Sequence, residues 1–301
     1  MGLAAQEGLR FFRPATAGII GAALAAARLE GLSRAQFNDV LGLAYSQAAG
    51  TMQAHVEASI ALPLQIAAAA RGAVSAVDCV ATGLNGPHDA LEGPFGYFTL
   101  FETGDVTQYA AELGKVWRIS EVSIKPFPSG RASHGVLGCL AQARSNGEVD
   151  SASVQRIEAH VPPLIHRLVG RPAKGDMTPA YARLCLPFLV ALMLRDGVID
   201  PRKFVADQFA DPELASMAAK VDVVLDGSSD PNALSPQRLI VETAQGRHEY
   251  AIVGNLGSPA APMNEIQAAQ KYDLARQLAG ADSDPRLFDD PLTYAIQGTD
   301  A

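Results

Sequence analysis

Three side chains that could together bind and process an anion lie within ten residues of one another: Lys125, Arg131 and His134. The residues between them are rich in proline and glycine, which is typical of a tight turn between regular elements. An ammonium, a guanidinium and the amides at a helix start favour carboxylate or phosphate, and a neighbouring histidine can move protons near neutral pH. The spacing therefore predicts an anion-binding loop, with a solvated surface loop as the simpler alternative.

The elements on either side of this loop determine how it is held. Residues 116–124 alternate between apolar and polar types, as do residues 154–161, and both patterns predict half-buried strands. Residues 135–144 have the apolar spacing of a helix. We therefore expect a strand to lead into the loop and a helix to follow it.

Helical patterns dominate both ends of the chain, and strand patterns lie in the middle. Much of the apolar content is alanine, which favours helices that pack closely. Capping residues, prolines and glycines at the segment ends support these assignments. The further predicted helices are 14–32, 33–50, 63–83, 179–194 and 264–278, with short ones opened by Asp200 and Asp211, and the further predicted strands are 221–225, 238–243 and 249–253.

The bulk composition argues against several classes of partner. A formal net charge of -8 and a pI near 5.2 disfavour a nucleic-acid surface, which needs clustered basic residues. The longest uninterrupted apolar runs are shorter than the roughly 20 residues that span a bilayer, and the first residues do not resemble a signal peptide. We therefore expect a cytoplasmic protein with no nucleic-acid partner, no membrane-spanning helix and no membrane partner.

The sequence also contains no pattern that indicates a metal or a cofactor. Its three cysteines are far apart, so they predict buried thiols and neither a disulfide framework nor a metal cluster. His55 and Glu57 are two residues apart, a spacing that would not place both ligands on one helical face. No glycine run has the spacing of a dinucleotide or phosphate-binding loop. We expect neither a metal nor a cofactor.

Four segments, in this order along the chain, resemble the motifs of one protein family: Phe12-Arg-Pro-Ala-Thr-Ala-Gly, Tyr45-Ser-Gln-Ala-Ala-Gly-Thr-Met, Leu91-Glu-Gly-Pro-Phe-Gly-Tyr-Phe and Lys125-Pro-Phe-Pro-Ser-Gly-Arg-Ala-Ser-His-Gly. With these motifs the chain resembles the MmgE/PrpD family over nearly its whole length. That family comprises cofactor-independent lyases and epimerases of small polycarboxylates, such as 2-methylcitrate dehydratase, cis-aconitate decarboxylase and iminodisuccinate epimerase.

The resemblance implies a mainly α protein. Its large all-helical domain would be built from the N- and C-terminal segments, residues 1–115 and 257–301. Residues 116–256 would form a smaller α+β lid domain. A cleft between the domains and a homodimer are also implied.

The step shared by this family is proton transfer α to a carboxylate, so the resemblance implies a small polycarboxylate substrate. Such chemistry needs cations that hold carboxylates and stabilise an enolate-like state, together with an acid and a base. Lys125 matches a lysine that lines the family cleft, His134 is a candidate acid or base, and His166 matches a polar cleft residue more loosely. The implied substrate-binding residues are Arg13, Thr16, Ser129, Arg131 and Arg183.

Two positions depart from the family pattern. Arg13 stands where members usually carry histidine before the proline, and Leu62 stands where several carry lysine. Arginine can bind a carboxylate but is a poor proton carrier, and leucine can do neither. Relatives also begin with further helices, which carry an aspartate and a histidine facing the cleft, so we expect this chain to be N-terminally short.

Three functions therefore stay open from the sequence. The first is a dehydratase-like lyase, in which the α proton is removed and a hydroxyl group leaves. An epimerase would use the same groups and return the proton to the opposite face. The third is an inactive family member that serves as a subunit or as a binding module for small acids.

Overall fold

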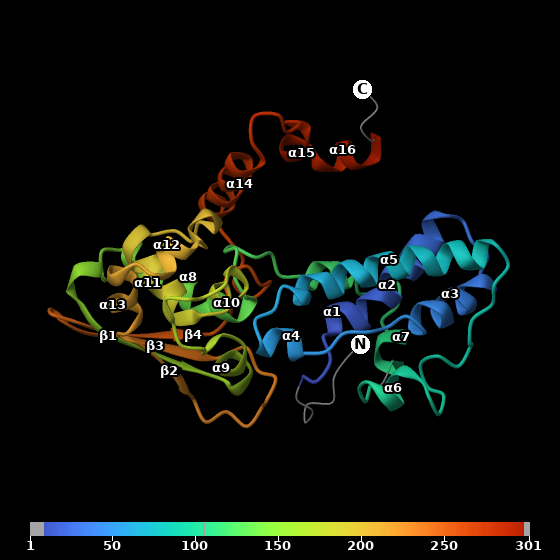
Figure 1. The fold of residues 1–301 in the computed structure, drawn as a ribbon, viewed down its shortest axis with the longest axis horizontal. Helices are drawn as coiled ribbons and strands as arrows, with labels where there is room; N and C mark the ends of the chain where they lie inside the picture. The colour runs from blue at the N-terminus through green and yellow to red at the C-terminus, as the bar shows by residue number, and fades with distance from the viewer. Residues whose placement is uncertain (1–8, 105, 298–301) are drawn as a thin grey trace. The chain divides into compact units, whose positions relative to one another are not determined.

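The computed structural model describes residues 9–104 and 106–297, and the chain divides into two compact units (Figure 1). The first unit ends at Trp117 and includes residues 229–232, and the second contains residues 118–228 and the chain from residue 233 onward. This division groups the segment after residue 257 with the second unit. The expected union of that segment with the N-terminal helices stays a prediction.

The first unit is helical, and its three predicted long helices are confirmed. The first of them is interrupted at Ala17, where a short helix ends and a longer one begins. The helices are α1 (Arg13–Thr16), α2 (Gly18–Leu29), α3 (Gln36–Tyr45), α4 (Gln53–Val56), α5 (Ala61–Ala81), α6 (Tyr97–Leu100) and α7 (Thr107–Ala110).

Alanine sets the spacing between the helices of the first unit. Helix α2 packs against α3 and α5. The buried side of α5 consists of alanine and valine side chains, which allow neighbouring helices to approach closely. A Cβ atom on Gly72 would lie 2.8 Å from Cδ1 of Ile19. A larger residue at this position of α5 would therefore require the Ile19 side chain to shift. The close packing expected from the alanine content is confirmed in this core.

Helix α5 differs from the expectation that no helix could span a membrane. Among the described residues it is the one helix long and apolar enough to do so, judged by length and composition alone. Only 28% of its most apolar window is buried. Because core helices outside membranes meet the same criterion, the observation does not locate the protein, but it does identify an exposed apolar face.

The second unit alternates helices and strands. The helix expected after the basic loop is α8, and the expected strand at 154–161 is β1; both are confirmed, as are the strands expected at 221–225, 238–243 and 249–253. Its elements are η1 (Arg118–Glu121), η2 (Arg131–Ser133), α8 (His134–Ser145), η3 (Ser151–Ser153), β1 (Val154–Val161), α9 (Pro163–Val169), α10 (Pro179–Ala182), α11 (Leu186–Asp196), η4 (Pro201–Lys203), α12 (Ala206–Phe209), α13 (Pro212–Ala218), β2 (Val221–Leu225), β3 (Gln237–Thr243), β4 (Gly246–Ile252), α14 (Glu265–Ala279), α15 (Arg286–Asp289) and α16 (Pro291–Gln297).

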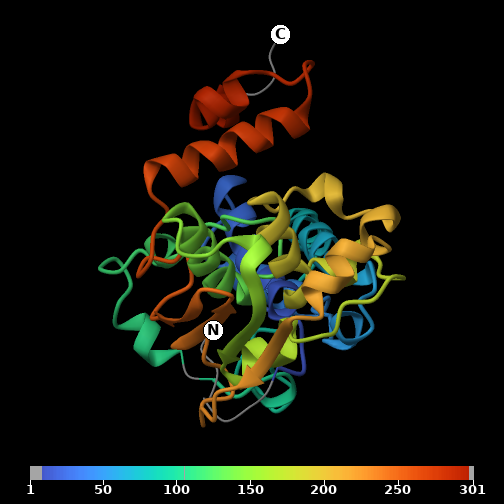
Figure 2. The same ribbon diagram turned by 90° about the vertical axis from the view of Figure 1, so that its left-hand side faces the viewer.

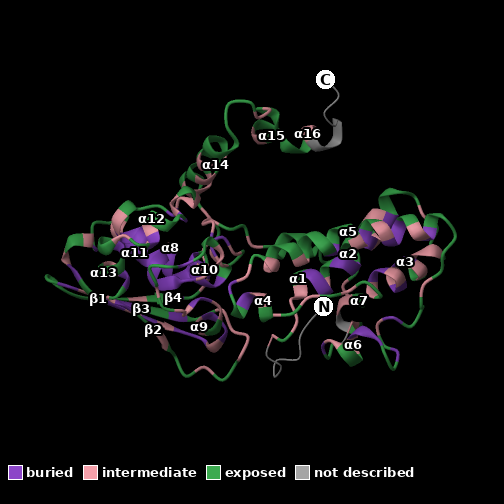
Figure 3. Ribbon diagram, in the orientation of Figure 1, coloured by how far each residue is buried: buried purple, intermediate pink, exposed green. Residues whose placement is uncertain are grey.

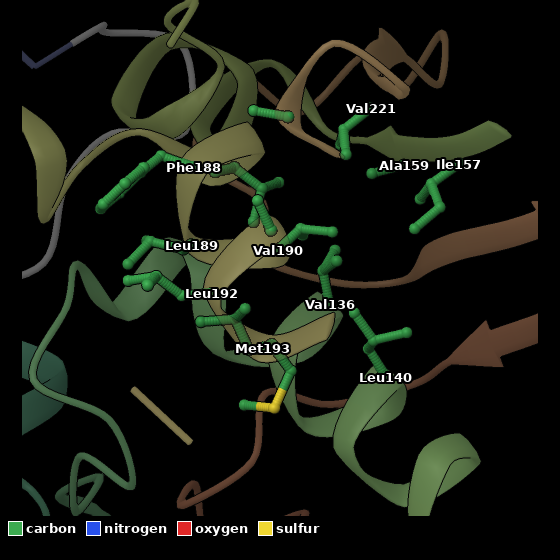
Figure 4. Close-up of a cluster of buried hydrophobic side chains, with 14 of the residues drawn as sticks. Val136, Leu140, Ile157, Ala159, Phe188, Leu189, Val190, Leu192, Met193 and Val221 are labelled. Atoms are coloured by element: carbon green, nitrogen blue, oxygen red, sulfur yellow. The ribbon is translucent and has the colours of Figure 1, made fainter. Parts of the chain in front are cut away.

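A four-stranded mixed sheet in the order β2-β1-β3-β4 organises this unit (Figure 2). Strand β1 is parallel to β2 and antiparallel to β3, and β3 is antiparallel to β4. Helix α11 packs against β2, and α8 packs against β3 and β4. Side chains from α8 and α11 fill the space in front of β1 (Figure 4). Residues Leu186–Leu194 of α11 are all buried, which makes this helix the centre of the core.

The expectation of a mainly α fold is wrong. The structure is 49% helical and contains the mixed sheet, and the unit that holds the sheet is the larger of the two. The individual strands of the sheet were predicted from the sequence, but the resemblance assigned them to a small lid. Because the sheet provides one wall of the main core, it is a principal layer of the fold.

The strand predicted for residues 116–124 is also wrong. Residues 118–121 form the 3₁₀ turn η1 instead. A strand requires a partner that accepts its backbone hydrogen bonds, and the sheet has no strand from this segment. Its apolar side chains are exposed, with Trp117 at 74% and Ile119 at 78%. The alternation in this segment therefore does not mark a face buried within the described chain.

Helix α14 is confirmed where the tail pattern predicted a helix. Asn264 and Gln267 form a reciprocal capping box at its start. None of its residues is buried, and Figure 3 shows exposed and intermediate residues along α14 and α15. Both helices project from the body of their unit in Figures 1 and 2.

The turn after β4 fixes the chain that leads into the basic loop. The Ile124 amide donates to the Gly257 carbonyl at 2.8 Å. Gly257 has φ +86°, and a Cβ atom there would lie 1.9 Å from the carbonyl oxygen of Ile124. Only glycine fits this close approach without movement of the backbone.

We predict that Gly257→Ala lowers the free energy of unfolding by about 3 kcal/mol or more, because it adds a backbone clash to the strain of a positive φ. Gly280→Ala is the matched control, since Gly280 has φ +81° with open space around it. It should cost only about 1 kcal/mol. Urea unfolding followed by circular dichroism measures both, and equal losses would contradict the proposed contact.

Candidate active site

The basic loop, residues 125–134, is held by hydrogen bonds within it and by one to the chain before α11. The Lys125 ammonium donates to the Ser129 carbonyl at 3.0 Å. The Ser129 amide in turn donates to the Phe127 carbonyl at 2.8 Å. Farther along, the Gly130 amide donates to the Arg183 carbonyl at 2.9 Å, which attaches the loop to the chain before α11. Lys125 is therefore oriented by the loop that carries it.

Two serine hydroxyls are used inside this loop. Ser129 is 5% exposed, and its Oγ lies 2.8 Å from Oγ of the fully buried Ser133. Ser133 donates to the Gly130 carbonyl, which leaves the Ser129 hydroxyl as the donor between the two serines. Ser129, an expected substrate-binding residue, lies beside Lys125, but its hydroxyl is engaged in holding the turn.

His134, the last residue of the loop, is only 1% exposed. Burial, and then the positive charges of Lys125 and Arg131, lower the pKa of His134 to about 4, although hydrogen bonds from the ring to the carbonyls of Ser129 and Phe127 act in the other direction. The ring is therefore neutral at neutral pH. Its Nε2 is buried without a hydrogen-bond partner in the described chain, so the carbonyl contacts belong to Nδ1.

The positive charge of the loop is not neutralised by a carboxylate. Lys125 and Arg131 are both exposed, and neither forms an ion pair within the part of the chain that the structure describes. Partial burial, and then the neighbouring charge of Arg131, lower the pKa of Lys125. Each cation therefore disfavours the other, and a bound anion would relieve that repulsion. The geometry is suited to a carboxylate or a phosphate.

Two further predicted residues lie near this loop with different surroundings. His166 is partly exposed on α9, a helix that packs against η2. The carbonyl of Arg183 contacts the loop, but its guanidinium lies over the Phe204 ring at 5.6 Å. The structure therefore brings the backbone of Arg183 to the loop and directs its charge elsewhere.

Arg13 belongs to the first unit, where it has a carboxylate partner. Its Nε donates to Glu102 at 2.7 Å, and Glu102 is 8% exposed. One terminal nitrogen of Arg13 is buried with no hydrogen-bond partner among the described residues. A buried donor of this kind is costly unless another acceptor binds it. Arg13 thus keeps a donor for an acceptor such as a carboxylate while Glu102 orients it.

Thr16 is fully buried one helical turn after Arg13. Its Oγ1 lies 3.2 Å from the hydroxyl of Tyr97, which is also fully buried and stacks on Phe101 with ring centroids 5.2 Å apart. The structure places Thr16 in a polar contact within the core of its unit. Neither Glu102 nor Tyr97 was expected at this position, although Tyr97 lies in the Glu-Gly-Pro-Phe-Gly-Tyr motif, which could have indicated it.

A hollow in the second unit includes Gly135, the residue after His134, in its lining. It has a volume of about 360 Å³ and is lined by α8, β4 and the turn that follows β4. Its lining begins at Gly135, next to His134, and does not include Lys125 or Arg131. The basic loop and this hollow are therefore separate features of the second unit.

Comparison with known proteins places both parts of the chain in one family. The family model described as MmgE/PrpD N-terminal domain matches residues 1–110, and the model described as MmgE/PrpD C-terminal domain matches residues 127–284. Residues 127–134 of the basic loop lie at the start of the second match, and Lys125 lies just before it. Residues 111–126 between the matches include the segment that was wrongly predicted as a strand.

Two relatives carry the name cis-aconitate decarboxylase. The chain is 27% identical to the Homo sapiens protein over 221 residues, which are 71% of this chain and 45% of that protein. It is 26% identical to the Mus musculus protein over 220 residues, 70% of this chain and 44% of that protein. The match thus spans less than half the length of either relative.

We predict that the neutral burial of His134 makes stability depend on pH. Below about pH 6.5 the unfolded histidine binds a proton that the folded one does not bind until about pH 4, so stability falls as pH is lowered through this window. The loss should reach about 3 kcal/mol. In urea unfolding at a series of pH values, His134→Asn should flatten the pH dependence of the free energy of unfolding. His166→Asn is the control for the removal of a histidine. An unchanged slope in His134→Asn would contradict the prediction.

Proposed function

Because the chain belongs to the MmgE/PrpD family, we propose that it is a cofactor-independent lyase that acts on a small hydroxy-polycarboxylate. The observation that supports this most directly is the pair of exposed cations, Lys125 and Arg131, with no carboxylate partner in the described chain. Removal of a proton α to a carboxylate creates negative charge on that carboxylate, and two preplaced cations stabilise it.

Lys125 and Arg131 have different tasks in this proposal. The planar guanidinium of Arg131 is suited to bidentate binding of one carboxylate. Lys125 supplies a compact charge that is already oriented by the Ser129 carbonyl, so it stabilises the enolate-like state without a large reorganisation. A substrate with at least two carboxylates would engage both cations.

The sequence left open whether His134 acts as an acid or as a base. In this proposal it is the base, which accepts the proton. A ring that is neutral at neutral pH and donates through Nδ1 has a lone pair on Nε2 and no proton there to give. Since the ring is 1% exposed, Nε2 meets a substrate only when the groups that bury it move aside. An experiment can distinguish direct proton transfer by His134 from a role in which His134 only supports the loop.

Arg13, which belongs to the first unit, is proposed as a further carboxylate-binding residue. Its orientation by Glu102 and its unpartnered terminal nitrogen support this role. A cytoplasmic location and the absence of a cofactor remain part of the proposal. The names of the relatives favour a lyase over an epimerase, although an epimerase would use the same cations.

The experiment is to incubate the protein in heavy water with citrate, 2-methylcitrate, cis-aconitate and iminodisuccinate, and to follow the reaction by NMR. A lyase should give a new product with at least one of them, through loss of water or of carbon dioxide. An epimerase should incorporate deuterium at the α carbon. Binding without exchange or product formation, detected by calorimetry, would indicate the inactive binding module and contradict the proposed lyase.

We predict that Lys125→Ala and Arg131→Ala each lower kcat/KM at least about 100-fold, because each removes charge that stabilises the transition state. Lys174→Ala and Arg167→Ala are the matched controls, since both side chains are exposed on the same unit outside the basic loop. They should leave the rate within about threefold of the original. A full rate in Lys125→Ala would remove its proposed role.

His134→Asn separates the two tasks of the histidine. The asparagine amide can donate at the place of Nδ1 and so support the loop, but it has no group at the place of Nε2. If His134 accepts the proton, kcat falls at least about 100-fold while KM changes little. If it only supports the loop, His134→Asn keeps most of the rate and His134→Ala does not, which would contradict the proton-accepting role.

A further inference from the structure

The hollow between α8 and β4 has a lining that the candidate active site does not use. The α8 residues of this lining recur at the three- and four-residue spacing of a single helical face, and they are Gly135, Gly138, Cys139, Gln142, Ala143 and Asn146. Strand β4 and the turn after it supply most of the remainder, including the apolar side chains of Ile252 and Leu256. The hollow is therefore mainly apolar, and small side chains on α8 limit how far that helix fills it.

Of the described residues that line this hollow, only Glu148 carries a charge. Its carboxylate accepts a hydrogen bond from Nδ2 of Asn146 at 2.8 Å. This bond, and then the interaction with Tyr250, lower the pKa of Glu148, so the carboxylate is ionised at neutral pH. His248 is near enough to affect it electrostatically, but Glu148 forms no ion pair within the described part of the chain.

The charge of Glu148 acts on other groups that line the hollow. Burial, and then this charge, raise the pKa of the Cys139 thiol to about 11. Burial, and then the interaction with Glu148, raise the pKa of the Tyr250 hydroxyl to about 12. Both groups therefore resist becoming anions beside the carboxylate, and the same field favours a cation in the hollow.

These features together indicate the chemical class of a ligand. A volume of about 360 Å³ lies at the lower end of the range of small-molecule sites, so the ligand must be small. Contact of its apolar body with the walls would be driven by the hydrophobic effect, and a charge-assisted hydrogen bond to the carboxylate would orient it. We propose that this hollow binds a small amine, with the ammonium group at Glu148 and the apolar body between α8 and β4.

This site would select a cation, whereas the basic loop is suited to an anion. Neither Lys125 nor Arg131 contributes to the lining, so the amine site does not depend on the proposed lyase activity. The two proposals are therefore tested independently.

The first test uses the unmodified full chain and isothermal titration calorimetry with hexylamine and 2-phenylethylamine. Their uncharged counterparts, hexan-1-ol and 2-phenylethanol, have the same apolar body and should bind about tenfold more weakly or worse, because they lack the ionic contact with Glu148. Failure of both amines to bind would overturn the proposal. Alcohols that bind as tightly as the amines would overturn it as well, since the ammonium group would then have no partner.

The second test locates the ammonium group. Glu148→Gln should raise the dissociation constant of either amine about tenfold and leave that of the alcohols nearly unchanged. Glu265→Gln is the matched control, since it removes an exposed carboxylate at the start of α14 on the same unit, outside the hollow. It should change the constants less than about twofold. Equal binding of the amines to Glu148→Gln and to the original protein would contradict the proposed contact, and circular dichroism checks that both variants fold.

The third test uses Cys139 as a reporter inside the hollow. Its alkylation by iodoacetamide, followed by peptide mass spectrometry, should slow when an amine is bound, and Glu148→Gln should remove this protection at the same amine concentration. Without amine, Glu148→Gln should speed the alkylation, because loss of the nearby negative charge lowers the pKa of the thiol. An alkylation rate that saturating amine leaves unchanged would place the amine outside the hollow and overturn the proposal.

Discussion

Two backbone hydrogen bonds, one just before the basic loop and one inside it, are the constraint on which the candidate site depends. Ile124 donates to the Gly257 carbonyl before the loop, and Gly130 donates to the Arg183 carbonyl within it. Prolines at 126 and 128 remove two amide donors, so the loop cannot close by a regular helix or strand pattern. Its shape is imposed from outside, by the turn after β4 and by the chain that enters α11.

The same external support explains how two cations can stay close together. Lys125 is attached to the Ser129 carbonyl, and the serine pair beneath it holds the turn. Repulsion between Lys125 and Arg131 therefore cannot be relieved by a large movement of the loop. Folding energy from the sheet and from α11 offsets this repulsion, and the site retains charge that a bound anion can neutralise.

Most regular elements could be predicted from the sequence, because each has a local signature. The period of apolar residues identified α2, α5 and α11, and alternation identified β1. Alternation failed at residues 116–124, where the apolar side chains find no sheet to cover. Periodicity describes what a segment could bury, and only the tertiary structure determines whether a partner is present. The weight of the sheet in the fold was missed for the same reason.

The basic loop was predictable because its side chains are close in sequence. The contacts of Arg13 with Glu102 and of Thr16 with Tyr97 were not, since they join residues 89 and 81 positions apart. The neutral state of His134 was equally hidden, because it results from burial at the end of a loop whose position is set by distant turns. Sequence reasoning found the charges of the site, and the structure supplied the partners that determine their protonation and direction.

The acidity of the chain gives the basic loop a particular significance. With a net charge of -8, the molecule as a whole repels polycarboxylates at long range. At physiological ionic strength this repulsion is screened beyond about 8 Å, whereas a carboxylate in contact with Lys125 and Arg131 is within that distance of both. Attraction at the loop can therefore outweigh the repulsion of the remaining surface. An anion that reaches the molecule therefore binds preferentially to cations that lack a carboxylate partner. Binding is much weaker at arginines that are already paired, as Arg195 is with Asp211.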